Sequence, residues 1–188
     1  MQFSEILLKR RSIRKYLDQA VDMDLVQEII HDATFAPSAG NEQPWQFIIV
    51  TDTDLLQRIS DDCKTNLLAR IANNPNDYAQ KYQKMLQNPA FQIFYHAPCL
   101  IIIGGERHVK NLDVDCTLAA SYIMMSATAR GLGTCWINFA REITDPEILS
   151  QLGLPDTYTI VAPIILGYPA IEPSVPTRKE ASIIKIVT

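Results

Sequence analysis

Hydrophobic positions recur at helical spacing in five stretches of the chain, and runs rich in β-branched residues separate them. The clearest helix follows Asp22, a candidate N-cap, and places an apolar stripe from Leu25 to Ala33 on one face before Pro37. The stretch 112–130 is almost uniformly apolar or small, which predicts a helix that is buried on most sides and ends at Gly131. The other expected helices cover about 3–11, 54–72 and 144–153.

Four runs of β-forming residues are too short for buried helices and predict strands. These runs are 46–50, 99–105, 134–139 and 158–168. Helical and extended segments alternate without an internal repeat, and 188 residues is about the size of one ordinary domain. We therefore expect a single domain over residues 1–188.

Two stretches do not follow this regular pattern. Residues 73–90 are polar and poor in core residues, which predicts a surface excursion or lid. The tail from about 169 to 188 is rich in proline, yet it ends in the β-forming sequence IIKIV at 183–187. Because a lone strand leaves backbone groups unpaired, this end is expected either to join its own sheet or to reach a second subunit, with an extended arm slightly favoured.

Composition and charge narrow the function classes. The 47% hydrophobic and 20% charged fractions fit a folded protein, and no segment approaches the roughly 18 uninterrupted apolar residues of a membrane span. The N-terminus lacks the pattern of a secretory signal, so cytoplasmic residence is the default expectation. A sequence pI of about 5.3 argues against nucleic-acid binding. The four cysteines show no C-x-x-C spacing, which argues against a zinc site and disulfides.

The sequence LLKRRSIRKY, residues 7–16, concentrates basic side chains in a chain of net charge −4. No acidic residue lies between Glu5 and Asp18 to offset them. One interpretation is a solvated basic helix end that interacts with the helix dipole. The other is an anion site, in which arginines that flank Ser12 donate to a phosphate group, and the choice of arginine over lysine modestly favours it.

The sequence APSAGNEQPW, residues 36–45, has a similar ambiguity. Its small residues and prolines are typical of an ordinary turn between a helix and a strand. The same residues can also expose backbone donors and acceptors to a ligand.

Taken together, four motifs resemble the nitroreductase family of FMN-dependent oxidoreductases and follow its order over nearly the whole chain. The motifs are RRSIRKY at 10–16, APSAGNEQPW at 36–45, GLGTCWI at 131–137, and LGYP at 166–169 followed by Arg178. The resemblance implies an α+β fold of three layers, in which helices flank a mainly antiparallel sheet. It also implies a homodimer with two flavins at the interface and an exchanged C-terminal arm, about 169–188.

The resemblance also implies a role for particular residues. The FMN phosphate and polar edge would contact Arg10, Arg11, Ser12 and Arg14, with Arg178 or Lys179 joining from the tail. A loop from the other subunit would contribute Pro37, Ser38, Ala39 and Asn41. The isoalloxazine ring would lie along Cys135, Trp136 and Ile137, and the phosphoribityl chain near Leu166 and Gly167. Asn138 departs from the family pattern, in which many members have glycine.

The implied reaction is a ping-pong transfer in which NADH or NADPH gives a hydride to the flavin and a nitroaromatic, quinone or related acceptor then takes the electrons. The missing G-x-G-x-x-G motif is compatible with a nicotinamide that only visits the flavin. Two alternatives stay open: a flavin-binding protein without turnover of its own, and a nucleic-acid binder that uses the basic stretch.

Several other residues are weaker candidates. A contact to the flavin pyrimidine edge is expected from Lys64, Asn66 or Arg70. Five aromatic residues would either stack on the electron acceptor or pack in the core or an interface: Tyr78, Tyr82, Phe91, Phe94 and Tyr95. A metal site is not expected at the next four residues. They should lie in a solvated connection between a strand and the acidic start of a helix: Glu106, His108, Asp113 and Asp115. Burial rather than nucleophilic chemistry is expected for Cys135, because its flanks are apolar and no histidine is near in sequence.

Overall fold

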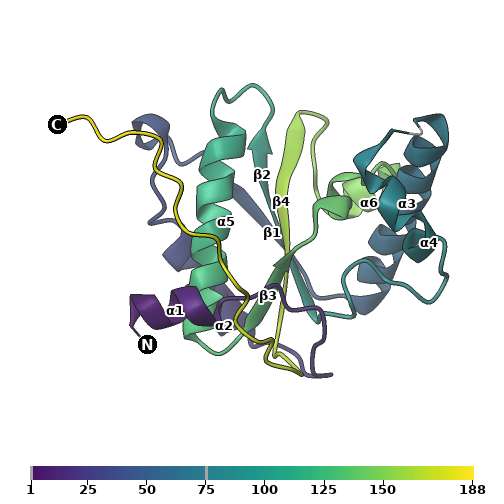
Figure 1. Ribbon diagram of the computed structural model, residues 1–188. Coiled ribbons are helices and arrows are strands. Elements are labelled where there is room, and N and C mark those ends of the chain that lie inside the picture. Colours follow the sequence, from purple (N-terminus) through teal and green to yellow (C-terminus); the bar gives the residue numbers. More distant parts are fainter. Residues whose placement is uncertain (1, 75) are drawn as a thin grey trace.

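Four antiparallel strands form the centre of the computed structural model, which describes residues 2–74 and 76–188 (Figure 1). Pro75, which falls inside the predicted 73–90 excursion, lies outside the described residues, as does Met1. The sheet order is β1–β2–β4–β3. The strands are β1 (Gln46–Val50), β2 (Cys99–Glu106), β3 (Gly133–Trp136) and β4 (Tyr158–Gly167).

The central pair of strands sets the register of the sheet. Cys99 lies opposite Leu166, and the pairing runs to Glu106 opposite Tyr158 with a bulge between Ile103 and Gly104. Gly104 is required there, because a Cβ atom would lie 2.1 Å from the carbonyl oxygen of Thr159.

Helices cover both faces of this sheet and complete three layers, as Figure 1 shows. One face packs against α2 (Met23–Ala33) and α5 (Leu112–Ala129), with α1 (Phe3–Lys9) resting against α5. The other face packs against α3 (Thr53–Asn73), α4 (Gln83–Leu86) and α6 (Pro146–Gln151). This arrangement confirms the predicted α+β architecture and its antiparallel sheet.

Local signals account for most helix ends. The carboxylates of Asp22, Asp52 and Asp145 each accept a hydrogen bond from a backbone N–H in the first turn of the helix that follows. Gly131 adopts a φ of 78° just after α5, as expected for the left-handed residue that ends a helix.

Three details of the prediction were wrong. The first helix ends at Lys9 rather than near residue 11, so the arginines that follow are extended. The third strand ends at Trp136, and the short 3₁₀ helix η3 (Asn138–Arg141) replaces the rest of it. The 73–90 excursion contains η2 (Tyr78–Tyr82) and α4 instead of being irregular throughout. Residues 183–187 form no strand and do not join their own sheet, which leaves the extended arm, the alternative that the sequence slightly favoured.

The four cysteines are free and buried. Within residues 2–74 and 76–188, helices that are both long enough and apolar enough for a membrane crossing are absent.

Candidate functional site

Residues 10–16, which we call the basic segment, lie along the outer edge of β3. Ser12 forms a parallel bridge with Thr134, and the amide of Ile13 donates to the carbonyl of Thr134 at 2.9 Å. Two glycines allow this close approach. A Cβ atom on Gly133 would lie 2.6 Å from the Ile13 side chain, and one on Gly167 would lie 2.8 Å from the Tyr16 ring.

The arginines of this segment differ in their partners. Arg11 donates to the backbone carbonyl of Ser174 in the tail. Neither Arg10 nor Arg14 forms an ion pair with a carboxylate in the part of the chain that the structure describes. Two cationic groups without a carboxylate, beside the hydroxyl of Ser12, suit an anionic ligand with several oxygen acceptors.

Cys135 lies within the electrostatic reach of these groups. Burial raises the pKa of the Cys135 thiol, although the guanidinium of Arg14, a hydrogen bond with Ser12 and the charge of Arg10 each act to lower it. The thiol is therefore neutral near pH 7, which does not favour a nucleophilic role. Ser12 pairs with Thr134, the neighbour of Cys135, and Arg10 and Arg14 flank Ser12 at alternate positions of the same extended segment, so the three residues lie beside this end of β3.

A cavity of about 290 Å³ opens beside Arg14, with Tyr16, Phe91, Gln92 and Tyr95 in its wall. The Arg14 guanidinium lies 5.9 Å from the centre of the Tyr95 ring, within the range of a cation–π contact. Tyr95 and His96 are both left-handed, with φ of 54° and 55°. Consecutive non-glycine residues rarely adopt this conformation, and such strain is often found at ligand sites.

The loop that contains Pro37, Ser38, Ala39 and Asn41, which we call the Ser38 loop, is held by hydrogen bonds of its own. The Ser38 hydroxyl accepts the amide of Gln43 at 3.0 Å, and the amide of Ala39 donates to Asp115 Oδ1 at 3.1 Å. Asp115 is 2% exposed, and its Oδ2 atom has no hydrogen-bond partner among the described residues. A buried carboxylate in the first turn of α5 thus fixes the position of this loop.

The two groups of predicted flavin contacts lie at opposite ends of α5 (Figure 1). The Ser38 loop contacts Asp115 near the start of the helix, whereas Ile13 packs against Gly133, just beyond its end. Thr128 lies 13 positions after Asp115 in the helix, which corresponds to about 20 Å at 1.5 Å per residue. One chain therefore does not bring both groups to one small ligand.

The remaining predicted contacts have different surroundings. Cys135 and Ile137 pack toward α3, whereas Trp136 packs toward α5, as expected for alternate positions on a strand. The Leu166 side chain is fully buried between the sheet and α5, so only its backbone is available to a ligand. Arg178 lies exposed in the tail.

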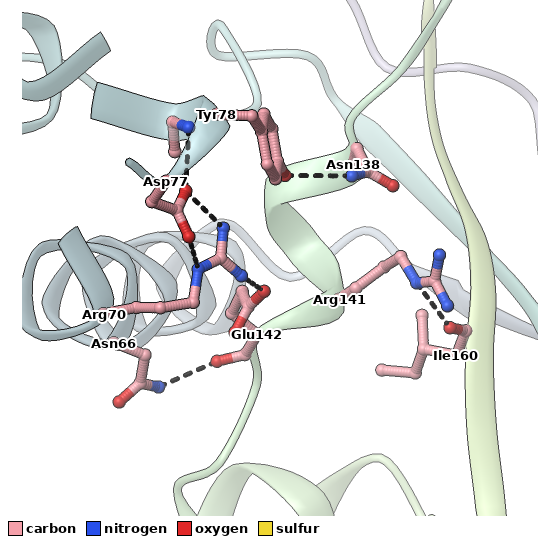
Figure 2. Close-up of polar contacts among 9 residues, drawn as sticks. Asn66, Arg70, Asp77, Tyr78, Asn138, Arg141, Glu142 and Ile160 are labelled. Atoms are coloured by element: carbon pink, nitrogen blue, oxygen red, sulfur yellow. Dashed lines mark hydrogen bonds and ion pairs between the residues drawn. The ribbon is translucent and has the colours of Figure 1, made fainter. Parts of the chain in front are cut away.

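The three candidates for the pyrimidine edge have partners within the protein instead. Lys64 Nζ donates to the carbonyls of Asn88 and Phe91 at 3.1 and 2.8 Å. Asn66 donates to the backbone carbonyl of Glu142 at 2.7 Å, and Arg70 pairs with Asp77 and Glu142 (Figure 2). These side chains tie surface segments to α3, so the donors named here are already used within the protein.

The acidic residues after β2 also separate. Asp113 faces Arg141 at 3.9 Å, whereas Asp115 is buried beneath the Ser38 loop. Among residues 2–74 and 76–188, no group of three or more histidine, cysteine or acidic side chains could hold a metal ion.

Sequence analysis missed the role of Asp115 as the support of the Ser38 loop. Its position is the only local signal, since an acidic residue inside an otherwise apolar helix must find a partner when buried. The closeness of Tyr95 to Arg14 has no signal in the sequence, because 81 positions separate them.

Comparison with known proteins identifies the family. The model described as "Nitroreductase family" matches residues 7–168. A protein of Archaeoglobus fulgidus named "Putative NADH dehydrogenase/NAD(P)H nitroreductase" is 31% identical over 167 residues, which are 88% of this chain and 84% of that protein. Human iodotyrosine deiodinase 1 is 24% identical over 200 residues, with 99% of this chain and 68% of that protein covered.

Solved structures agree with the sequence comparison. A nitroreductase from Bacteroides fragilis, solved with bound FMN, superimposes with a TM-score of 0.80 at 25% identity. The superposition covers 100% of this chain and 98% of that one.

We predict that the two oxygens of Asp115 contribute differently to the Ser38 loop. Asp115→Leu should lower the free energy of unfolding by about 1–3 kcal/mol and expose the Ala39 amide to exchange, since it leaves that N–H without an acceptor. Asp115→Asn keeps an acceptor and removes a buried charge, so it should retain both properties. Urea unfolding and hydrogen exchange measure them, and equal damage from the two variants would contradict the assignment.

We also predict that the folded protein reacts slowly with thiol reagents. Burial raises the pKa of Cys99 and Cys116 to about 12 and raises those of Cys63 and Cys135 as well. At pH 8, Ellman's reagent should therefore modify less than one thiol in minutes, and four after denaturation. The neutral thiols favour the fold below about pH 8.5, and this contribution is lost as the pH rises toward 12. Rapid reaction assigned to Cys135 would restore its candidacy as a nucleophile.

Proposed function

This chain belongs to the nitroreductase family, and we propose that it is an FMN-dependent oxidoreductase with NADH or NADPH as electron donor. The proposed acceptor is a nitroaromatic, a quinone or a related conjugated compound, reduced in a ping-pong scheme by one flavin-binding domain over residues 1–188. The observation that carries the proposal is the pair of cations, Arg10 and Arg14, that flank Ser12 beside β3 without a carboxylate partner in the described residues.

The residues of the site fit FMN. A flavin phosphate carries a charge near −2 and three acceptor oxygens, which match the guanidinium groups of Arg10 and Arg14 and the Ser12 hydroxyl. The donors lie on one extended segment rather than on a flexible loop, since backbone hydrogen bonds fix residues 13, 15 and 17. The FMN bound to the Bacteroides fragilis structure supports the same cofactor here.

When bound, FMN supplies the two-electron chemistry that no side chain of this protein can perform. The overall reaction is NAD(P)H + H⁺ + quinone → NAD(P)⁺ + hydroquinone. A nitro group instead takes two electrons and two protons and becomes a nitroso group and water. In this scheme the basic segment neutralises the cofactor charge, and β3 provides a rigid edge against which the ring is oriented.

The proposed active form is a homodimer. The Ser38 loop and the basic segment lie about 20 Å apart along α5, so a second copy related by a two-fold axis would bring the loop of one to the arginines of the other. The surface also supports an interface. Large apolar side chains are exposed on α1, α5 and the tail, namely Phe3, Leu7, Leu8, Val114, Ile171, Val175, Ile183, Ile184, Ile186 and Val187.

The extended tail fits a role as the exchanged arm. Ile184 is 99% exposed, and residues 176–188 have no regular secondary structure in their own chain. Such a concentration of exposed β-branched residues is typical of a segment that is covered by a partner.

Anaerobic reduction tests the function itself. The FMN-loaded protein should lose its absorbance near 450 nm within seconds of mixing with NADH or NADPH at micromolar concentration, and a nitroaromatic or quinone should restore it. Binding of FMN without bleaching by either donor would support a flavin-binding protein without turnover. Failure to bind FMN would contradict the whole proposal. Iodotyrosine belongs in the acceptor panel because a deiodinase is among the relatives.

The phosphate contact predicts a specific pattern of affinities. Arg10→Ala and Arg14→Ala should each weaken FMN binding by about 10-fold or more, because each removes a charge-assisted hydrogen bond. Loss of a phosphate contact should weaken the binding of FMN more than the binding of riboflavin. Loss of a ring contact should weaken the binding of both ligands equally. Lys110→Ala, an exposed position after β2, removes the same charge and should leave affinity unchanged. Fluorescence titration measures all three, and equal effects from Lys110→Ala would reduce the site to a general charge effect.

The arm predicts a dependence of assembly on the tail. Replacing Ile183, Ile184, Ile186 and Val187 together by serine should shift the dimer toward monomer at micromolar concentration, since it removes apolar surface from the interface. Leu17→Ser, at an exposed position outside the tail, serves as the control. Sedimentation velocity reports the outcome, and an unchanged dimer in the tail variant would show that the arm is dispensable for assembly.

A further inference from the structure

We infer that Tyr78 is a specificity-determining residue for the electron acceptor and that Arg70 positions it beside Asn138. The inference rests on the proposed function and extends it to residues outside the basic segment and the Ser38 loop. It assigns to Tyr78 a hydrogen bond to an oxygen atom of an aromatic acceptor.

Tyr78 occupies an unusual position for an aromatic residue. It begins η2 and is 55% exposed, yet its side chain is not free in solution. Its hydroxyl oxygen accepts a hydrogen bond from Asn138 Nδ2 at 3.1 Å, and the Arg70 guanidinium lies 5.4 Å from the ring centre. Figure 2 shows the ring between Arg70 on α3 and Asn138 on η3.

Arg70, Asp77 and Glu142 form what we call the Arg70 cluster. Arg70 Nε lies 2.9 Å from Asp77 Oδ2, and the same guanidinium pairs with Glu142. Asp77 Oδ1 in turn accepts the amide of Ala79 at 2.8 Å, and this bond and Arg70 lower the pKa of Asp77. The cluster thereby connects α3, the start of η2 and the end of η3, and it fixes the backbone on both sides of Tyr78.

The position of Asn138 connects Tyr78 and the Arg70 cluster to the proposed flavin site. Asn138 directly follows Cys135, Trp136 and Ile137, the residues proposed to lie along the flavin ring. The excursion packs on the same 3₁₀ helix a second time, where the rings of Tyr82 and Phe139 meet edge to face at 5.4 Å. Tyr78 therefore contacts the residue that directly follows the proposed ring contacts, from the side of the excursion.

The hydrogen bonding of Tyr78 defines the class of acceptor. Asn138 uses a lone pair of the phenol oxygen, so the O–H remains a donor, and no acceptor for it is found among residues 2–74 and 76–188. A half-exposed aromatic ring whose O–H can still donate suits a planar compound with a nitro or carbonyl oxygen. Arg70 is committed to two carboxylates, so this cluster offers no additional cation to an acidic acceptor.

Stopped-flow kinetics of the FMN-loaded protein test the inference. After anaerobic reduction with dithionite, reoxidation by nitrobenzene or benzoquinone should be about 5- to 10-fold slower in Tyr78→Phe, because the lost hydrogen bond is worth about 1 kcal/mol. Reoxidation by ferricyanide, which needs no such contact, should change less than twofold. Reduction by NADH or NADPH should also be unchanged. Gln80→Ala, in the same 3₁₀ helix, should match the wild type in every step.

Arg70 as a positioning residue predicts a non-additive double variant. Arg70→Gln should slow nitrobenzene reoxidation as Tyr78→Phe does, and the double variant should be no slower than either single variant. Additive effects, or equal effects on ferricyanide, would reduce Arg70 to a general role in stability. An unchanged rate in Tyr78→Phe would overturn the assignment of Tyr78. Because dithionite replaces the nicotinamide, both results are independent of whether NADH or NADPH is the donor.

Discussion

The antiparallel pairing of β2 with β4 is the constraint on which the rest of the structure depends. Both strands are buried on both faces, and their alternate side chains enter different layers. Ile102 packs toward α3, whereas Ile101 and Ile103 pack toward α5. A slip of one residue would exchange these layers, so the register is strongly specified. β3 pairs with β4, and the basic segment lies on β3, so the position of Arg14 follows from the same register.

The length of α5 imposes a second constraint, which concerns assembly. The Ser38 loop is hydrogen-bonded to the start of α5, and the end of α5 leads into β3. The buried face of α5 packs against β2 and β4 and so fixes the positions of both ends. A shorter separation would require a different core. The proposed flavin contacts therefore fall into two separate groups on one chain, and the proposed homodimer would also cover the exposed apolar residues of α1, α5 and the tail. Binding of the cofactor and association of subunits are expected to be coupled for this reason.

Much of this fold could be predicted from the sequence because the strong signals are local. The strand 46–50 and the helix after Asp22 follow from β-branched residues and from an N-cap with an apolar stripe. The errors arise where partners distant in sequence decide. For the same reason the strand propensity of residues 183–187 left their pairing open, and the described chain offers them no partner strand. Ile137 and Phe139 are β-forming residues and predict a strand. The chain instead forms η3, where the Phe139 ring packs on Tyr82 and the Asn138 amide contacts Tyr78.

The same limit applies to the candidate site. Arginine and lysine look alike in a sequence whether they bind a ligand or a carbonyl of their own chain, and only the fold distinguishes them. Lys64 and Arg70 were candidates on their charge, but their donors are used by the backbone carbonyls of Asn88 and Phe91 and by two carboxylates. Arg10 is half-buried and Arg14 is exposed, and neither has a carboxylate partner in the described chain, so their donors are open to a ligand. This difference in available donors, rather than the charge itself, is the reason that Arg10 and Arg14, and not Lys64 and Arg70, are the proposed phosphate contacts.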